Sequence, residues 1–199
     1  MTEFQFGSGV AVHKFCKTCG SSIGGEVKAA DKHMIAINVR LFEDIDVSRL
    51  SLKHDDRKSY GTNYVYPHFP SGSDATLDHS LVAYHGNCQC KTVTFTAYLS
   101  SLSETEVIED NCSICAKNGY ILAYPKPKDV VFHSGSESLA TYTFNTKRIP
   151  HRFCQKCGSS VYLDRTALGR DDFGMNVRMF KDVDLNALKY RYFDGKTLL

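Results

Sequence analysis

The 199-residue sequence predicts a mainly β fold of small antiparallel sheets, in which part of one structural unit occurs twice. Three observations support this prediction. Short β-branched or aromatic stretches alternate with turn residues, the cysteines form close pairs, and one ten-residue phrase is repeated almost unchanged. Together they indicate short strands that are joined by tight turns and held by cysteine side chains.

The strand signals lie mostly in the middle of the chain. In KTVTFTAYL (91–99) the residues Val93, Phe95 and Ala97 alternate with polar ones and share one face. Three further stretches are short and bounded by Gly, Pro or Asn, and predict strands: 119–125, 129–135 and 138–146. Helical signals are confined to 183–190 and to its copy around 47–52, where an Asp precedes each predicted short helix.

Charge and hydropathy exclude two classes of partner. The chain has 24 basic and 22 acidic residues, which are interspersed without a basic stripe, so we expect no nucleic-acid binding. No run of 18 apolar residues occurs, so no membrane span is expected. The N-terminus lacks the cationic start and apolar run of a secretory signal, which predicts a soluble, cytoplasmic protein.

The repeat defines the expected domain organisation. A shift of 138 residues aligns positions 4–50 with 142–188, and 16 of these 47 pairs are identical. The segment from about 85 to 141 has no counterpart before Met1, so the earlier copy corresponds to the second half of a unit. We therefore expect a half-unit in 1–60 (the first copy), a linker in 61–84, and a nearly complete unit in 85–199, whose residues 142–199 are the second copy.

The eight cysteines favour metal binding. They form four close pairs, which are Cys16/Cys19, Cys88/Cys90, Cys112/Cys115 and Cys154/Cys157. Without a secretory signal the thiols are expected to stay reduced, so metal ligation is favoured over disulfides or unligated core thiols. Close pairs from separate segments are typical of tetrahedral zinc sites.

Two of these pairs complete a structural zinc site. Cys88 and Cys90 are two residues apart at the mouth of a predicted strand, so their thiols lie on the same face. Cys154 and Cys157, followed by Gly158, have the spacing of a zinc-binding turn. The four thiolates would join the two halves of the unit through one ion.

The remaining central pair predicts a second zinc. Asp110 precedes Cys112 and Cys115 in the series D-x-C-x-x-C, and a carboxylate is an accepted zinc ligand. Three protein ligands with an open fourth position are typical of a catalytic zinc. The alternative is that Asp110 is a solvated loop residue and that the catalytic site has been lost.

Four separated motifs resemble one known family. GNCQC (86–90), NCSIC (111–115), TYTFNT (141–146) and HRFCQKCGSS (151–160) are similar to those of glutathione-dependent formaldehyde-activating enzymes and centromere protein V, the GFA domain. The resemblance covers 85–199 as a whole domain and 4–60 as the latter half of another. It implies a β-tent of small antiparallel sheets around a structural zinc, held by the four cysteines just described.

The same resemblance implies a catalytic zinc at the central segment, and hence two zinc ions per chain. The family pattern there is similar to C-x-C-x-x-C, from which this chain departs because Asp110 replaces the first cysteine. The charge of the ligand set is retained, but a hard oxygen replaces a soft sulfur. The expected activity is that of a carbon–sulfur lyase, which adds glutathione or a similar thiol to formaldehyde or a related electrophile.

Other readings stay open. A non-catalytic, zinc-stabilised interaction module is the main alternative, since the first copy is incomplete and Asp110 departs from the family. Cys16 and Cys19 compete with Cys154 and Cys157 for a shared zinc site with the pair Cys88/Cys90. We expect Cys16 and Cys19 to form an incomplete metal site, or to take part in redox chemistry. The first copy also predicts uncovered strand edges, through which the chain could form a homodimer.

Weaker signals come from residues near these motifs. His13 and His151 precede the C-x-x-C pairs and are expected to pack or to form backbone hydrogen bonds rather than bind metal. The remaining candidates could bind a glutathione carboxylate or line a pocket, although structural pairing or a simple turn explains them as well: Asn38, Arg40, Lys117, Asn118, Gly119, Asn176 and Arg178.

Overall fold

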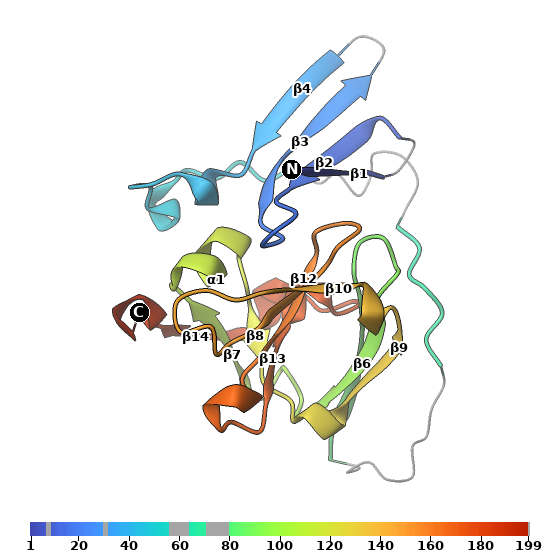
Figure 1. Ribbon diagram of the computed structural model, residues 1–199, viewed down its shortest axis with the longest axis vertical. Helices are drawn as coiled ribbons and strands as arrows, with labels where there is room; N and C mark the ends of the chain where they lie inside the picture. The colour runs from blue at the N-terminus through green and yellow to red at the C-terminus, as the bar shows by residue number, and fades with distance from the viewer. Residues whose placement is uncertain (7–8, 30–31, 56–63, 71–79, 199) are drawn as a thin grey trace.

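The computed structural model describes residues 1–6, 9–29, 32–55, 64–70 and 80–198, and is shown in Figure 1. Within these residues the strands form three sheets, so the predicted mainly β fold is confirmed. One sheet lies wholly in the first copy, with antiparallel order β1-β2-β3-β4. Its strands are β1 (Thr2–Phe6), β2 (Ala11–Phe15), β3 (Ser22–Ala29) and β4 (Lys32–Ile37).

The complete unit holds the other two sheets. The seven-stranded sheet has the order β10-β11-β12-β13-β8-β7-β14, and the three-stranded sheet has the order β5-β6-β9. Their strands are β5 (Val82–Asn87), β6 (Thr94–Leu99), β7 (Glu106–Asp110), β8 (Leu122–Ala123), β9 (Val130–Ser134), β10 (Leu139–Tyr142), β11 (His151–Cys154), β12 (Ser160–Asp164), β13 (Phe173–Asn176) and β14 (Lys189–Phe193). Neighbouring strands are antiparallel except β14, which pairs in parallel with β7.

The helical segments are short. The α-helix in the described chain is α1 (Ser113–Asn118), and no described helix is long and apolar enough to cross a bilayer. The 3₁₀ turns are η1 (Val39–Leu41), η2 (Val47–Arg49), η4 (Pro127–Asp129), η5 (Ser136–Ser138), η6 (Thr166–Leu168), η7 (Val177–Met179), η8 (Leu185–Ala187) and η9 (Gly195–Leu198).

The two predicted short helices, at 183–190 and around 47–52, are only the 3₁₀ turns η8 and η2. Asp184 begins η8 by accepting a hydrogen bond from the amide of Asn186 at 3.0 Å. Residues 189–193 are a strand instead, because their alternating aromatic side chains suit the pairing with β7. Helix α1 was not predicted, since six residues are too few to display a helical period.

The main hydrophobic core belongs to the complete unit. Its largest cluster of buried apolar residues runs from Phe95 to Phe180 and joins the seven-stranded sheet to the three-stranded one. Among the apolar side chains described in the first copy, Phe15 alone is buried. The first copy therefore repeats the strands of a unit without the core that normally goes with them.

The two copies fold alike at the local level. A bulge between Lys14 and Phe15 in the β2–β3 pair recurs between Arg152 and Phe153 in the β11–β12 pair. Asp44 and its counterpart Asp182 both adopt positive φ, at 59° and 57°. Each such feature lies 138 residues from its equivalent, so the sequence repeat is also a structural repeat.

The copies contact each other reciprocally through their cysteine turns. We call residues 16–20 the first knuckle and residues 154–158 the second knuckle. A Cβ placed on Gly20 would lie 2.5 Å from Cγ of Phe153, and one placed on Gly158 would lie 2.5 Å from Cγ of Phe15. Both glycines also have a φ of +75°, which disfavours any other residue. Figure 1 shows the turn between β2 and β3 reaching the complete unit.

The segment expected to be a linker is in part attached to the complete unit. Tyr64 donates a hydrogen bond to the carbonyl of Gln89 at 3.3 Å, and Phe69 stacks on His85 with ring centroids 4.8 Å apart. Residues 61–63 and 71–79 of this segment lie outside the described residues. The domain boundary at 61–84 stays a prediction.

Phe15→Ala should lower the free energy of unfolding by about 3 kcal/mol, because it leaves a cavity against Gly158. Phe42→Ala, at a half-exposed phenylalanine of the same copy, is the matched control and should change stability by at most about 0.5 kcal/mol. Urea unfolding of the zinc-loaded proteins measures both. Equal effects of the two substitutions would contradict the reciprocal packing.

Candidate metal centres

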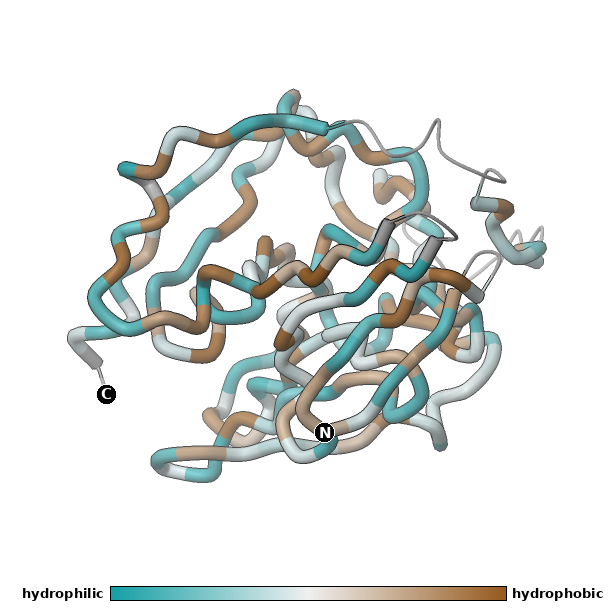
Figure 2. Tube along the Cα trace, turned by 90° about the horizontal axis from the view of Figure 1, so that it is seen from above, coloured by the Kyte–Doolittle hydropathy of each residue, from teal (hydrophilic) through white to brown (hydrophobic). Residues whose placement is uncertain are grey.

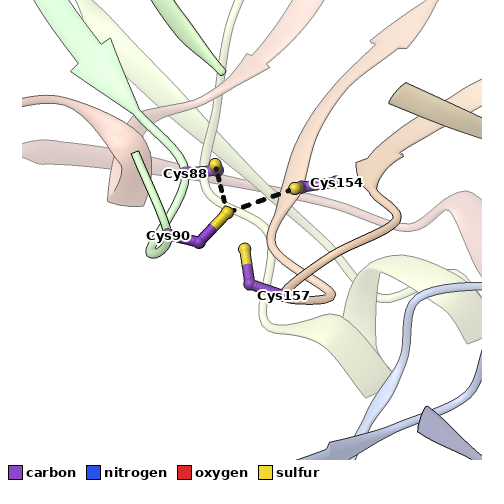
Figure 3. A group of neighbouring side chains, drawn as sticks. All are labelled: Cys88, Cys90, Cys154 and Cys157. Atoms are coloured by element: carbon purple, nitrogen blue, oxygen red, sulfur yellow. Dashed lines mark hydrogen bonds between the residues drawn. The ribbon is translucent and has the colours of Figure 1, made fainter. Parts of the chain in front are cut away.

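Four thiols meet between the two halves of the complete unit. Cys88 and Cys90 come from the turn that links β5 to β6, and Cys154 and Cys157 come from the second knuckle between β11 and β12 (Figure 3). Their sulfur atoms all lie within 4.8 Å of one another. The Sγ of Cys90 is 3.4 Å from that of Cys88 and 3.6 Å from that of Cys154.

These distances suit a tetrahedral zinc. Four ligands at a Zn–S distance of about 2.3 Å would place the sulfurs about 3.8 Å apart. The donor set is the four-thiolate type of structural zinc sites, so the residues present fit this ion. All eight cysteines of the chain are free thiols, so the alternative of disulfides is not realised here.

The backbone holds the second knuckle in its curled form. The amide of Gly158 donates to the carbonyl of Cys154 at 2.8 Å, and the amide of Cys154 donates to the carbonyl of Ser159 at 2.9 Å. On the opposite turn, the amide of Val93 points at the sulfur of Cys88 at 3.3 Å. Amides directed at a sulfur favour the thiolate form, which is the form that binds metal.

The four thiols also contact one another directly, through Cys88 with Cys90 and Cys90 with Cys154. Hydrogen bonds from Cys154 and Cys88 hold the pKa of Cys157 well below its usual range. The same contacts raise the pKa of Cys88, because it is the donor in this network and is also buried. A divalent cation bound among the four sulfurs would stabilise the thiolate form of all of them.

A second cluster lies at the start of α1. Asp110 ends β7, Cys112 is the residue before the helix, and Cys115 lies within it, so that one ligand atom of each falls within 4.8 Å of the others. Oδ1 of Asp110 accepts a hydrogen bond from the amide of Cys112 at 2.8 Å, which fixes the carboxylate beside the thiols. The structure therefore brings together the three residues of the D-x-C-x-x-C series.

The two thiols of this cluster are buried and the carboxylate is half-buried. A hydrogen bond from Cys115 lowers the pKa of Cys112, and the same bond together with burial raises the pKa of Cys115. Both cysteines belong to a buried apolar cluster that includes Tyr120, and Tyr124 packs against that cluster. The cluster thus combines two sulfurs and one oxygen in an apolar setting, which fits a zinc ion with a position left for another ligand.

Comparison with known proteins places this geometry in a family. The family model described as glutathione-dependent formaldehyde-activating enzyme, GFA, matches residues 83–188, a range that includes both clusters. The chain belongs to the GFA family. Among solved structures, the chain is similar to the crystal structure of a Rhodobacter sphaeroides protein, with 25% sequence identity and a TM-score of 0.47. That match covers 54% of this chain and 99% of the other.

The first knuckle lies outside the matched range of the GFA family model. Its turn resembles the second knuckle, since the amide of Gly20 donates to the carbonyl of Cys16 at 2.9 Å. Cys16 and Cys19 are half-buried, and neither belongs to a cluster of three or more candidate ligands among the described residues. That the first knuckle is an incomplete metal site stays a prediction.

The histidines next to the knuckles are not among the clustered ligands. His151 is buried between Tyr120 and Phe144, with ring centroids at 5.9 and 5.7 Å, and burial lowers its pKa to about 4. His13 packs beside Phe15, and burial lowers its pKa as well. Both are therefore neutral packing groups at physiological pH, in line with the expectation that they pack.

The residues considered for a glutathione carboxylate have structural partners instead. Asn38 and its equivalent Asn176 each begin a 3₁₀ turn and each donate a hydrogen bond to a strand carbonyl at 2.9 Å. Arg178 donates to the carbonyl of Gly119 at 2.7 Å, and Arg40 donates to the carbonyl of Ala116 at 3.5 Å. These groups satisfy carbonyls at the end of α1, the helix that carries Cys115.

Residues 117–119, expected to be a turn or a pocket wall, form the end of α1. Gly119 adopts a left-handed conformation with a φ of 62° and closes the helix, while the carbonyl of Lys117 accepts a hydrogen bond from Asn38 at 3.2 Å. First-copy residues therefore contact the helix of the second cluster. The sequence carries no signal for this contact, because the two segments are far apart in the chain.

The C-terminal segment lies over the second cluster, which sequence reasoning missed. The side chain of Asn111 donates to Asp194 at 2.8 Å and accepts from the amide of Lys196 at 2.9 Å. A Cβ on Gly195 would clash with Oδ1 of Asp110. The C-terminal segment therefore limits the space that is available to the Asp110 carboxylate.

Cys154→Ser should remove about one zinc ion per chain and destabilise the complete unit, because it breaks the four-thiolate set. Cys16→Ser, the equivalent change in the first knuckle, should leave the zinc content unchanged and alter stability by at most about 0.5 kcal/mol. Elemental zinc analysis and urea unfolding of both variants measure this. The reverse ranking would mean that Cys88 and Cys90 pair with the first knuckle.

Proposed function

We propose that the chain is a zinc-dependent carbon–sulfur lyase of the GFA type, which adds a thiol such as glutathione to formaldehyde or a related electrophile. The observation that carries the proposal is the second cluster, in which Asp110, Cys112 and Cys115 offer three ligand atoms within 4.8 Å. The four-thiolate cluster would hold a structural zinc, and this cluster a catalytic one. A bound zinc supplies a Lewis acid that lowers the pKa of a thiol ligand.

Side chains at the second cluster would determine the charge and the polarity of the site. Asp110 accepts a hydrogen bond from the amide of Cys112, which holds its carboxylate beside the two thiols. The carboxylate and the thiols of Cys112 and Cys115 could therefore bind one cation together. Tyr124 packs against this cluster, and burial raises its pKa to about 12, so its phenol stays protonated at neutral pH. The two thiols are buried in an apolar cluster, and low-polarity surroundings strengthen electrostatic interactions.

The proposed reaction is an addition to a carbonyl. A bond forms between the thiol sulfur and the formaldehyde carbon, the π electrons move onto the oxygen, and the proton lost by the thiol ends on that oxygen. The product with glutathione is S-hydroxymethylglutathione. Cleavage of the same carbon–sulfur bond returns the thiol and formaldehyde.

A second candidate is a non-catalytic, zinc-stabilised interaction module. The observation that favours it is the hydrogen bond from the amide of Cys112 to Asp110, which gives this carboxylate a structural role without any metal. The large exposed apolar surface of the first copy points the same way. The two candidates differ in zinc content, because a scaffold requires only the four-thiolate site.

Cys112→Ser should lower the zinc content by about one ion per chain and abolish any acceleration of the glutathione–formaldehyde equilibration. The fold should persist, since the four-thiolate cross-link is intact. Zinc analysis, exchange NMR and circular dichroism measure the three effects. Ser113→Ala, at the exposed neighbour on α1, is the control and should change none of them.

The scaffold reading gives a different result. A chain that binds one zinc and leaves the exchange rate at its buffer value, before any substitution, would exclude catalysis. A chain that binds two ions and accelerates the exchange, with both effects lost in Cys112→Ser, would exclude a pure scaffold.

Substitutions around the carboxylate test whether Asp110 is a ligand. Asp110→Cys should tighten zinc at the second cluster, since a thiolate is the softer ligand. Gly195→Ala should weaken it about ten-fold, because the new methyl group displaces the Asp110 carboxylate without removing it. Competition with a chromophoric chelator measures both affinities. Lys196→Ala is the control, since Lys196 contacts Asn111 through its backbone amide. Unchanged affinity in both test variants would mean that Asp110 is not a ligand.

A further inference from the structure

Two arginines from equivalent positions of the two copies meet at the end of α1. Arg40 lies in η1 and Arg178 in η7, and in each turn the preceding asparagine, Asn38 or Asn176, accepts a hydrogen bond from the arginine amide. A Cβ placed on Gly119 would lie 3.5 Å from Nε of Arg40 and 3.9 Å from Nε of Arg178. The two guanidinium groups are therefore neighbours, although each belongs to a different copy. We call them the arginine pair.

The contacts with α1 orient the arginine pair without using all of its donors. Arg178 donates through Nε to the carbonyl of Gly119 at 2.7 Å, and Arg40 donates through Nη1 to the carbonyl of Ala116 at 3.5 Å. A guanidinium has more N–H groups than one carbonyl can accept, so each side chain retains donors for a further partner. Arg40 is half-buried and Arg178 is exposed over part of its surface, so a solute can reach these donors.

The arginine pair has no acidic partner in the part of the chain that the structure describes. No carboxylate oxygen there lies within 4.0 Å of either guanidinium. Burial and then the positive charge of Arg40 lower the pKa of Arg178, and the opposing effects of Tyr190 and Glu109 are smaller. The two cations therefore repel each other, and an anion bound between them would relieve this repulsion.

The surroundings of the arginine pair favour a small anion. Hydrophilic and hydrophobic residues alternate over short stretches of the trace (Figure 2). Each arginine has apolar neighbours in the sequence, a valine before it and Leu41 or Met179 after it. The pair is thus a local concentration of charge and not part of a basic stripe that would suit a polyanion. Arginine binds carboxylates through parallel N–H···O hydrogen bonds, so a carboxylate suits this site.

Helix α1 connects the arginine pair to the second cluster. Cys115 lies within the helix and Gly119 closes it, and four residues of helix rise by about 6 Å. In an extended peptide, a carboxylate two residue lengths from a thiol lies about 7 Å from it. The spacing therefore suits a peptide-like thiol, with its sulfur at the second cluster and its carboxylate at the arginine pair.

We propose that Arg40 and Arg178 together bind a carboxylate of the thiol substrate, so that the substrate class is a peptide-like thiol that carries a carboxylate. This inference rests on the proposed function, because the second cluster must receive the sulfur. The hydrogen bonds to α1 hold the two side chains in place for this task. The first copy then has a role in substrate binding, since it supplies one of the two arginines and neither copy forms the site alone.

The test measures binding of S-methylglutathione, which keeps both carboxylates of glutathione and has no free thiol. Arg40→Gln and Arg178→Gln should each weaken its binding to the zinc-loaded protein about ten-fold or more, because charge-assisted hydrogen bonds are lost. Arg49→Gln is the matched control at an exposed arginine of the first copy, which pairs with Asp46 at 3.1 Å, and should leave the affinity unchanged. Isothermal titration calorimetry measures all three. Equal affinities in Arg40→Gln and Arg49→Gln would overturn the proposal.

A second measurement uses the unsubstituted chain, so the proposal stays falsifiable if a variant fails to fold. The diethyl ester of S-methylglutathione has no carboxylate and should bind about ten-fold more weakly than the free acid. Equal binding of the ester and the acid would contradict the carboxylate site. Inorganic phosphate should compete only weakly with S-methylglutathione. Phosphate that binds as tightly, and loses its affinity in Arg40→Gln, would identify a general anion site and overturn the assignment to a carboxylate.

Kinetics separate a failure of this inference from a failure of the proposed function. Arg40→Gln should raise KM for glutathione about ten-fold or more and leave kcat nearly unchanged, because the arginine pair contacts the substrate away from the reacting atoms. Acceleration with the same KM in Arg40→Gln and the unsubstituted chain would retain the lyase and overturn the arginine site. Binding of S-methylglutathione that depends on both arginines, without any acceleration, would support the carboxylate site and contradict the lyase.

Discussion

The meeting of two turns, one from each half of the complete unit, is the interaction on which the remaining structure depends. Cys90 and Cys154 are 64 residues apart in the chain, yet their sulfurs lie 3.6 Å from each other. An ion bound there would contribute an apparent free energy of about 10–16 kcal/mol, which is comparable to the whole stability of a typical domain, at about 5–15 kcal/mol. The three-stranded sheet and the seven-stranded sheet are fastened at this point, and the hydrophobic core lies between them.

The two copies separate what a local sequence encodes from what its surroundings decide. The bulges, the 3₁₀ turns after β4 and β13, and the knuckles are alike, because hydrogen bonds within some twenty residues define them. Burial differs, because it depends on neighbours that only the second copy has. Val39 and Val177 occupy equivalent turns, but one is exposed and the other lies in the core. A repeated sequence thus specifies the same backbone without specifying the same packing.

The sequence predicted the features that have a short-range chemical signature. The pairing of Cys88 and Cys90 with Cys154 and Cys157 followed from ligand spacing, and the alternation in 91–99 gave β6 with Phe95 and Ala97 buried. Helix α1 was missed because its six residues show no helical period and its closing residue, Gly119, is equally typical of a turn.

Contacts between distant segments could not be derived in the same way. The parallel pairing of β14 with β7 and the position of Gly195 over Asp110 each join residues about 80 positions apart, and neither leaves a pattern in either segment alone. The contacts of Asn38 and Arg40 with α1 are of the same kind. The ligand residues of the candidate centres can therefore be predicted from the sequence, whereas the groups that position these ligands cannot.

The reciprocal packing of Phe15 on Gly158 and of Phe153 on Gly20 has the form of an isologous interface, in which one patch meets its own copy across a two-fold axis. A single unit that carries both the phenylalanine and the glycine holds every group that such an interface needs. When both patches lie in one polypeptide, their association no longer depends on the protein concentration. It depends instead on the effective concentration of one patch near the other, which the linker sets. The chain is, in this respect, a dimer contact made permanent by covalent connection.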